Sequence, residues 1–231
     1  MLQAFWEKIS LTLLEHQRYM YIIKGFGNTL LMTVFAVLLG IVIGLTIAAI
    51  KVWPRKSNLG KIANFFADCY LTVIRGTPVM VQLMIIYFVI FSSVTIDKML
   101  VAILAFGINS GAYVAEIIRA GIMGVDRGQM EAGRSLGLNY LTTMRTIILP
   151  QALKNILPVL GNEFIVLLKE TSVAGFIGTM DLAKAGDIIK SQTYEPMVPL
   201  LLVGAIYLVV VMLMTWVLHQ FEGRLRKSDY R

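Results

Sequence analysis

Cysteine and histidine are scarce in this chain of 231 residues. The single cysteine, Cys69, excludes an internal disulfide. Its neighbours Phe65 and Phe66 favour a buried, unreactive thiol. The two histidines, His16 and His219, stand near opposite ends of the chain. Neither has the Cys or carboxylate spacing of a metal site, so we expect no metal and no catalytic residue.

Charge is also scarce, since Asp, Glu, Lys and Arg make up only 15% of the residues. Hydrophobic residues make up 57%, which is more than soluble domains contain. Several uncharged runs reach the length of about 20 residues that a helix needs to cross a bilayer. The formal charge of +7 does not indicate nucleic acid, because the basic residues cluster at the ends of these runs. The composition predicts an all-α, polytopic membrane protein in contact with anionic lipid.

The hydrophobic pattern predicts five membrane crossings within a transmembrane domain of residues 25–222. These lie near residues 25–50, 63–91, 99–120, 155–168 and 196–218. Pro78 should break or kink the second of them. Residues 1–24 have an apolar face around Trp6 and are expected to form an amphipathic helix at the membrane interface. Residues 223–231 are expected to be a cytoplasmic tail.

The distribution of Lys and Arg predicts the orientation of these spans. The loops after the first and third spans and the C-terminal tail carry 13 of these residues. The segments on the other side carry seven. The richer side should be cytoplasmic, which places the N-terminus outside and the C-terminus inside.

The loop after the third span, residues 126–150, contains local signals for two short helices. Asp126, with Gln129 three residues later, predicts a capped helix that starts at Arg127. Gly137 suits the left-handed residue after that helix, and Asn139 suits the cap of the next. We expect Pro150 to mark a break before the fourth span.

This loop contains Glu131-Ala132-Gly133-Arg134-Ser135-Leu136-Gly137 and, nine residues later, Ile147-Ile148-Leu149-Pro150. The spacing resembles the cytoplasmic coupling motif of ABC-importer permeases, EAA-x3-G-x9-I-x-LP, with Gly133 in place of the second alanine. Small residues let a partner protein approach such a helix closely, and Glu131 and Arg134 offer charge to it.

Further stretches make the chain similar to the polar amino acid family of these permeases, which includes histidine, glutamine and arginine transporters. They run from about Gly25 to Arg224. The matching segments are Gly27-Asn28-Thr29-Leu30, Arg75-Gly76-Thr77-Pro78 with Gln82, Gly111-Ala112-Tyr113 with Glu116 and Arg119, Leu149-Pro150-Gln151-Ala152, Leu157-Pro158 with Gly161-Asn162, and Leu168-Lys169-Glu170-Thr171-Ser172.

The resemblance implies a type I importer fold in a prokaryotic cell membrane. It implies a second permease subunit, identical or similar, two cytoplasmic ATPase subunits and an extracytoplasmic amino acid-binding protein. No G-x-x-x-x-G-K-[ST] phosphate loop occurs in the chain. ATP and Mg²⁺ are therefore expected on the partner ATPase. The alternative function is an amino acid carrier or channel driven by an ion gradient, which the absence of an internal inverted repeat disfavours.

Polar residues within the predicted spans are candidates for the substrate path or its gate. Arg75 has two interpretations: an ion pair with Glu116, or contact with a substrate carboxylate. Asn109 and Tyr113 either bridge helices or face the path. The remaining candidates follow on the fourth span and just beyond it; they are Asn162, Glu163, Lys169, Glu170, Thr171 and Ser172. They can bind both charges of an amino acid or close an outer gate.

Overall fold

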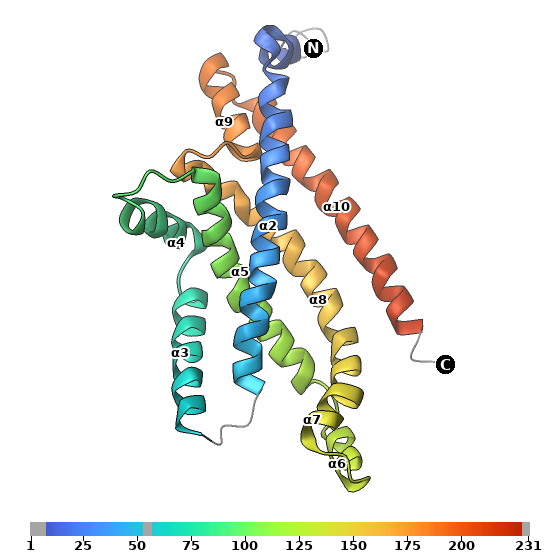
Figure 1. Ribbon diagram of the computed structural model, residues 1–231. Helices are drawn as coiled ribbons and strands as arrows, with labels where there is room; N and C mark the ends of the chain where they lie inside the picture. The colour runs from blue at the N-terminus through green and yellow to red at the C-terminus, as the bar shows by residue number, and fades with distance from the viewer. Residues whose placement is uncertain (1–7, 53–56, 228–231) are drawn as a thin grey trace.

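The computed structural model describes residues 8–52 and 57–227, with side chains through residue 224. Within these ranges the chain is helical and contains no strand (Figure 1). The α-helices are α2 (Tyr19–Val52), α3 (Asn58–Arg75), α4 (Val79–Ile85), α5 (Lys98–Met123), α6 (Arg127–Ser135), α7 (Tyr140–Thr143), α8 (Leu149–Glu170), α9 (Leu182–Thr193) and α10 (Met197–Lys227). Short 3-10 and π segments join or extend them: η1 (Ser10–Leu14), η2 (Glu15–Gln17), η3 (Ile86–Ile90), η4 (Met144–Ile148) and η5 (Thr171–Ile177).

Helices α2 and α5 form the centre of the bundle through a seam of glycines. A Cβ atom at Gly44 of α2 would lie 2.5 Å from Val114 Cγ1. A Cβ atom at Gly107 of α5 would lie 2.6 Å from Leu39 Cδ2. Even alanine would therefore push the two helices apart. Membrane helices, which gain nothing from water exclusion, associate through this kind of close backbone approach.

Three helices are long and apolar enough to cross a membrane: α2, α5 and α10 up to Arg224. Helix α3 and the α4–η3 segment together meet the same test but are bent by 107°, so the predicted break at Pro78 is confirmed. Helix α8 is not among these spans, since Lys154, Asn162 and Glu163 lie within it. It packs against α5 and α10 in the bundle (Figure 1). Five crossings therefore remain a prediction.

Two predicted domain boundaries fall inside helices. The boundary at 24/25 falls inside α2, which begins at Tyr19. Before it, η1 and η2 are interrupted at His16 and Gln17, where φ is 51° and 54°, so no continuous interfacial helix reaches residue 24. Trp6 lies outside the described residues. The boundary at 222/223 falls inside α10, because the helix continues to Lys227.

The prediction of a buried Cys69 is also wrong. Cys69 is exposed on α3, as are Phe65 and Phe66. Helix α3 packs through its opposite face, where Asn64 and Ala67 are buried. The aromatic neighbours therefore project outward with the thiol, as apolar residues do on the lipid-facing side of a membrane helix.

At the end of the bundle opposite α6, the start of α2 holds the start of α9 (Figure 1). Asn28 Nδ2 donates to the Met180 carbonyl at 2.7 Å, and Thr29 Oγ1 accepts from Leu182 N at 3.0 Å. Asp181 caps α9 between them, and burial raises the pKa of its carboxyl to about 6. The Gly27-Asn28-Thr29-Leu30 segment thus joins two elements through contacts between residues 152 and 153 positions apart in the sequence.

Candidate coupling helix and charged cleft

Helix α6 begins at Arg127, as predicted, and lies at the far end of the bundle from the N-terminal segment (Figure 1). Asp126 caps it by accepting from Gly128 N at 2.6 Å. The capping box predicted with Gln129 does not form. The Gln129 side chain instead accepts a 3.4 Å hydrogen bond from Gln151 on α8. This contact links the short helix to the base of a long one.

Gly137 ends α6 in the left-handed conformation that the sequence predicted, with φ of 87°. Leu138 N donates to the Gly133 carbonyl at 3.1 Å, and Gly137 N donates to the Arg134 carbonyl at 3.0 Å. These two bonds form a Schellman motif, which satisfies carbonyls that the end of a helix leaves free. Asn139 then caps α7 by accepting from Thr142 N at 2.8 Å. The turn between the two helices is therefore fixed by hydrogen bonds.

Of the seven residues of the predicted coupling motif, one is buried and the other six are exposed. Gly133 is buried, and a Cβ atom there would lie 2.5 Å from Thr143 Cγ2. The position therefore needs glycine here because α7 lies so close. The other six are exposed; they are Glu131, Ala132, Arg134, Ser135, Leu136 and Gly137. Leu136 is 81% exposed at the tip, which leaves an apolar contact point for another protein.

Pro150 does not mark a break, contrary to the prediction. Helix α8 begins at Leu149, directly after α7 and the π-helical turn η4, and Pro150 lies in its first turn. A proline in a helix lacks its amide donor and crowds the carbonyl four residues before it. The wider π turn accommodates this without a break. The chain is therefore helical without interruption from α7 through η4 into α8.

The Gln82 side chain makes most of the side-chain hydrogen bonds at the break between α3 and α4. Its Nε2 donates to the Ile74 carbonyl at 2.7 Å and to the carbonyl and hydroxyl of Thr77 at 3.0 and 2.7 Å. Its Oε1 accepts from Asn109 Nδ2 on α5 at 2.9 Å. Backbone groups freed by a helix break are costly in a membrane unless another group satisfies them. Gln82 does so and also ties the break to α5.

Asn109 belongs to this buried network. It is 3% exposed, and its contact with Gln82 favours the helix-bridging interpretation over the path interpretation. Nearby, Tyr70 of α3 donates to the Ile108 carbonyl at 2.6 Å. Sequence reasoning assigned no role to Gln82 or Tyr70. The sequence did contain a signal for Gln82, because it is a single amide side chain within an apolar stretch.

A cleft of about 1090 Å³ opens between the ends of α2, α3 and α5 and the helices α6 and α7. Arg75, at the C-terminal end of α3, lines it together with Tyr113, Glu116 and Arg119 of α5. Arg75 Nη1 lies 3.9 Å from Glu116 Oε2, and its guanidinium lies 5.7 Å from the centre of the Tyr113 ring. Two predicted path residues, Arg75 and Tyr113, thus come together.

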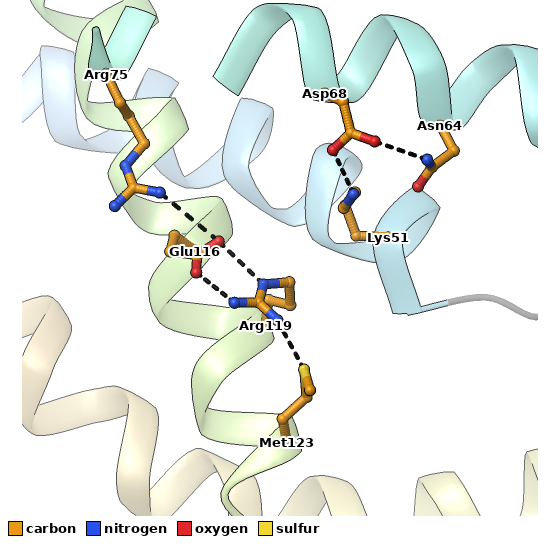
Figure 2. Close-up of polar contacts among 7 residues, drawn as sticks. All are labelled: Lys51, Asn64, Asp68, Arg75, Glu116, Arg119 and Met123. Atoms are coloured by element: carbon orange, nitrogen blue, oxygen red, sulfur yellow. Dashed lines mark hydrogen bonds and ion pairs between the residues drawn. The ribbon is translucent and has the colours of Figure 1, made fainter. Parts of the chain in front are cut away.

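Glu116 is held mainly by Arg119, its neighbour one turn along α5 (Figure 2). Arg119 donates to both carboxylate oxygens, through Nε at 3.0 Å and Nη2 at 2.5 Å. The more distant Arg75 has a side chain that is 43% exposed. Its guanidinium therefore keeps donors directed to the cleft, where it can meet an anionic group without first losing a tight ion pair.

A second polar group borders the same cleft and joins α2 to α3 (Figure 2). Lys51 pairs with Asp68, whose other oxygen accepts from Asn64 Nδ2 at 2.8 Å. The sequence placed Lys51 in a cytoplasmic loop, whereas it lies in the last turn of α2. The cleft is therefore lined by charges of both signs from three long helices.

The candidates on the fourth span lie elsewhere. Glu163 accepts from Ser110 of α5 at 3.1 Å, and Thr171 is buried with its hydroxyl bonded to the Leu168 carbonyl. Asn162 and Lys169 are exposed, while Glu170 and Ser172 are half-buried. None of these six residues lines the charged cleft. Among the described residues, no group of three His, Cys, Asp or Glu side chains is placed to hold a metal ion.

Both the architecture and the sequence of this chain are similar to those of known proteins. The family described as the inner membrane component of binding-protein-dependent transport systems matches residues 36–227. The chain belongs to that family. The arginine transport system permease protein ArtQ of Bacillus subtilis is 36% identical over 211 residues, which is 90% of this chain and 94% of that relative. The glutamine transport system permease protein GlnP of Escherichia coli is 37% identical, covering 84% of this chain and 90% of its own length.

A solved structure agrees with these relatives. It is titled as an amino acid ABC transporter with histidines, is 44% identical to this chain and superposes with a TM-score of 0.83. The match covers 91% of this chain and 97% of that one. The helical, membrane-spanning fold of a type I ABC importer permease is therefore established for this chain.

Proposed function

We infer that this chain is the permease subunit of an ABC importer for polar amino acids of the glutamine and arginine type. The observation that carries this is the joint match of fold and sequence over nearly the whole chain to an amino acid ABC transporter. The coupling motif also folds as a distinct helix with an open surface. Family membership favours an ATP-driven importer over the alternative of an ion-driven carrier or channel.

The complex we propose contains a second permease subunit, two cytoplasmic ATPase subunits that bind ATP and Mg²⁺, and an extracytoplasmic binding protein. The chain lies in the inner membrane of a prokaryote, with α6 in the cytoplasm, the N-terminus outside and the C-terminus inside. The distribution of Lys and Arg supports this orientation. The absence of a phosphate loop supports a separate ATPase.

Transport proceeds by alternating access. Closure of the ATPases on ATP moves α6, and α7 and η4 carry the motion into α8 without a break in the helix. The bundle then opens outward, receives an amino acid, and returns inward after hydrolysis. The charged cleft next to α6 is the inner part of the path, where Arg75 offers a guanidinium to a substrate carboxylate. Glu163, Lys169 and Glu170 act nearer the outer gate.

The coupling role of α6 is tested at Gly137 and Glu131. Gly137→Val places a β-branched residue at a φ of 87°, which only glycine and a few polar residues adopt readily. It should distort the turn and uncouple ATPase activity from uptake. Glu131→Lys, a charge reversal on the exposed surface, should weaken binding of the ATPase. In both variants the protein should still reach the membrane in normal amounts.

The matched controls keep the local structure. Gly137→Asn retains access to the left-handed conformation, and Ser135→Ala removes only a hydrogen bond within α6, to the Glu131 carbonyl. Both should transport normally. The measurement is the ratio of uptake to ATP hydrolysis in vesicles that contain the purified complex. Normal ratios in Gly137→Val and Glu131→Lys would exclude α6 as the coupling element.

A further inference from the structure

A second groove lies next to the charged cleft, between the C-terminal end of α2 and α7, and shares Val52, Ile122, Tyr140 and Met144 with it. Its volume is about 430 Å³. Its walls are apolar residues of α2, α5, α7, η4 and α8; they are Leu45, Ala48, Ala49, Val52, Ile118, Ile122, Leu141, Met144 and Leu149. Only two polar side chains, Tyr140 and Arg145, join this lining.

The groove continues an exposed apolar stripe along α2. Leu31, Leu38 and Leu45 recur every seven residues on this helix and are 43%, 54% and 53% exposed. Val42, between the last two, is 62% exposed. Because α2 is long and apolar enough to cross the membrane, this stripe faces acyl chains. A chain that lies along the stripe enters the groove at Leu45 and Ala49.

Arg145 supplies the charge at the end of this route. It is exposed in η4, and no acidic side chain of the described residues forms an ion pair with it. Tyr140 also lines the groove, and tyrosine is typical of the boundary between headgroups and acyl chains. Basic pockets between membrane helices on the cytoplasmic side are suited to anionic headgroups.

We propose that this groove is a binding site for an anionic phospholipid, with an acyl chain against α2 and α5 and the phosphate at Arg145. The occupant is argued from the continuity of the groove with the lipid-facing stripe and from the charge of Arg145. The bound lipid fills the space between the ends of α2 and α5 and the segment that follows α6. The proposal rests on the predicted orientation of the chain in the membrane and not on which amino acid is transported.

Native mass spectrometry of the full chain in mild detergent tests the site with added phosphatidylglycerol and phosphatidylcholine. The wild type should retain phosphatidylglycerol preferentially. Arg145→Gln should reduce that preference about fivefold, the size expected for one basic residue near a headgroup. Ala49→Phe fills the groove and should reduce retention of both lipids. Arg145→Lys, which keeps the charge, should retain most of the preference.

Two controls make the same chemical changes outside the groove and the stripe. Lys61→Gln removes an exposed positive charge from α3, and Ala205→Phe adds an aromatic ring at an exposed position of α10. Both should bind lipid as the wild type does. An equal loss of preference in Lys61→Gln and Arg145→Gln, or full retention in Ala49→Phe, would overturn the proposal. The experiment measures only lipid binding, so its result does not depend on whether the proposed transport function is correct.

Discussion

Two polar clusters flank the break between α3 and α4, and they are built in opposite ways. The Gln82–Asn109 cluster is neutral and closed, with the two residues 8% and 3% exposed. The Arg75–Glu116–Arg119 cluster is charged and open, with side chains 43%, 27% and 32% exposed. One cluster fixes the geometry of the break, while the other presents charge beside it.

The difference follows from what each kind of group loses on leaving water. An amide can be buried at small cost when its hydrogen bonds are made, as those of Gln82 are. A charged group is much more costly to bury, even when it is paired. The charges therefore lie along the cleft, where water and a solute can reach them. We propose that the closed cluster stabilises the fold and that the open cluster acts in transport, and this separation can be tested.

The largest effect is expected from Gln82→Leu. The change leaves the Ile74 carbonyl and the Asn109 amide without their partner, at about 1–3 kcal/mol for each buried group that becomes unsatisfied. We expect less permease in the membrane and a clearly lower melting temperature in detergent. Gln192→Leu makes the same change at an exposed position of α9 and should have little effect. Equal stability of the two variants would show that the break does not depend on Gln82.

The local features of this fold could be predicted from the sequence, because capping and turn rules involve residues a few positions apart. The break at Pro78, the caps at Asp126 and Asn139, and the left-handed Gly137 are examples. Residues of the candidate site were also identified. Arg75 was correctly considered as a partner of Glu116, although Arg119 is the closer one.

The pairing of distant polar residues could not be predicted. Gln82 and Asn109 are 27 residues apart, and Thr29 and Leu182 are 153 apart, so their contacts depend on how whole helices pack. The error at Cys69 has a different origin. Helix α3 carries Asn64, Asp68 and Arg75 along one face, which turns toward α2 and the cleft, so its apolar face with Cys69 points away from the bundle.

In the open cluster, Arg75→Gln should leave stability nearly unchanged and reduce uptake. An exposed pair 3.9 Å apart contributes about 0–1 kcal/mol to folding. A charged hydrogen bond to a substrate carboxylate contributes about 1.5–3 kcal/mol, so uptake at low substrate concentration should fall about tenfold or more. Arg75→Lys keeps the charge but loses the planar guanidinium group, so uptake should fall less in this variant than in Arg75→Gln.

The same variant distinguishes the two interpretations of Arg75. If it contacts substrate, the apparent KM for uptake rises while the melting temperature stays constant. If it serves only to pair with Glu116, the apparent KM is unchanged, whether or not the melting temperature falls slightly. The second result would place Arg75 with the closed cluster and remove the contrast between the two.

A smaller effect is expected from Glu116→Gln. This change removes a negative charge from the cleft and leaves Arg75 and Arg119 without their carboxylate. A cationic amino acid should then be disfavoured relative to a neutral one, about threefold to tenfold, because the potential in the cleft becomes more positive. The measurement is the ratio of arginine to glutamine uptake. Asp187→Asn, the same loss of charge on α9, should not change that ratio.

The smallest effect is expected from Arg119→Gln, although Arg119 makes the shortest contacts in the cluster. Ion pairs three residues apart on an exposed helix contribute about 0.3–0.5 kcal/mol, so the melting temperature should hardly change. Without Arg119, the Glu116 carboxylate should pair more closely with Arg75, whose guanidinium is already 3.9 Å away. That new pair should compete with substrate and raise the apparent KM about twofold. A large drop in stability would mean that the open cluster, like the closed one, is needed to hold the fold.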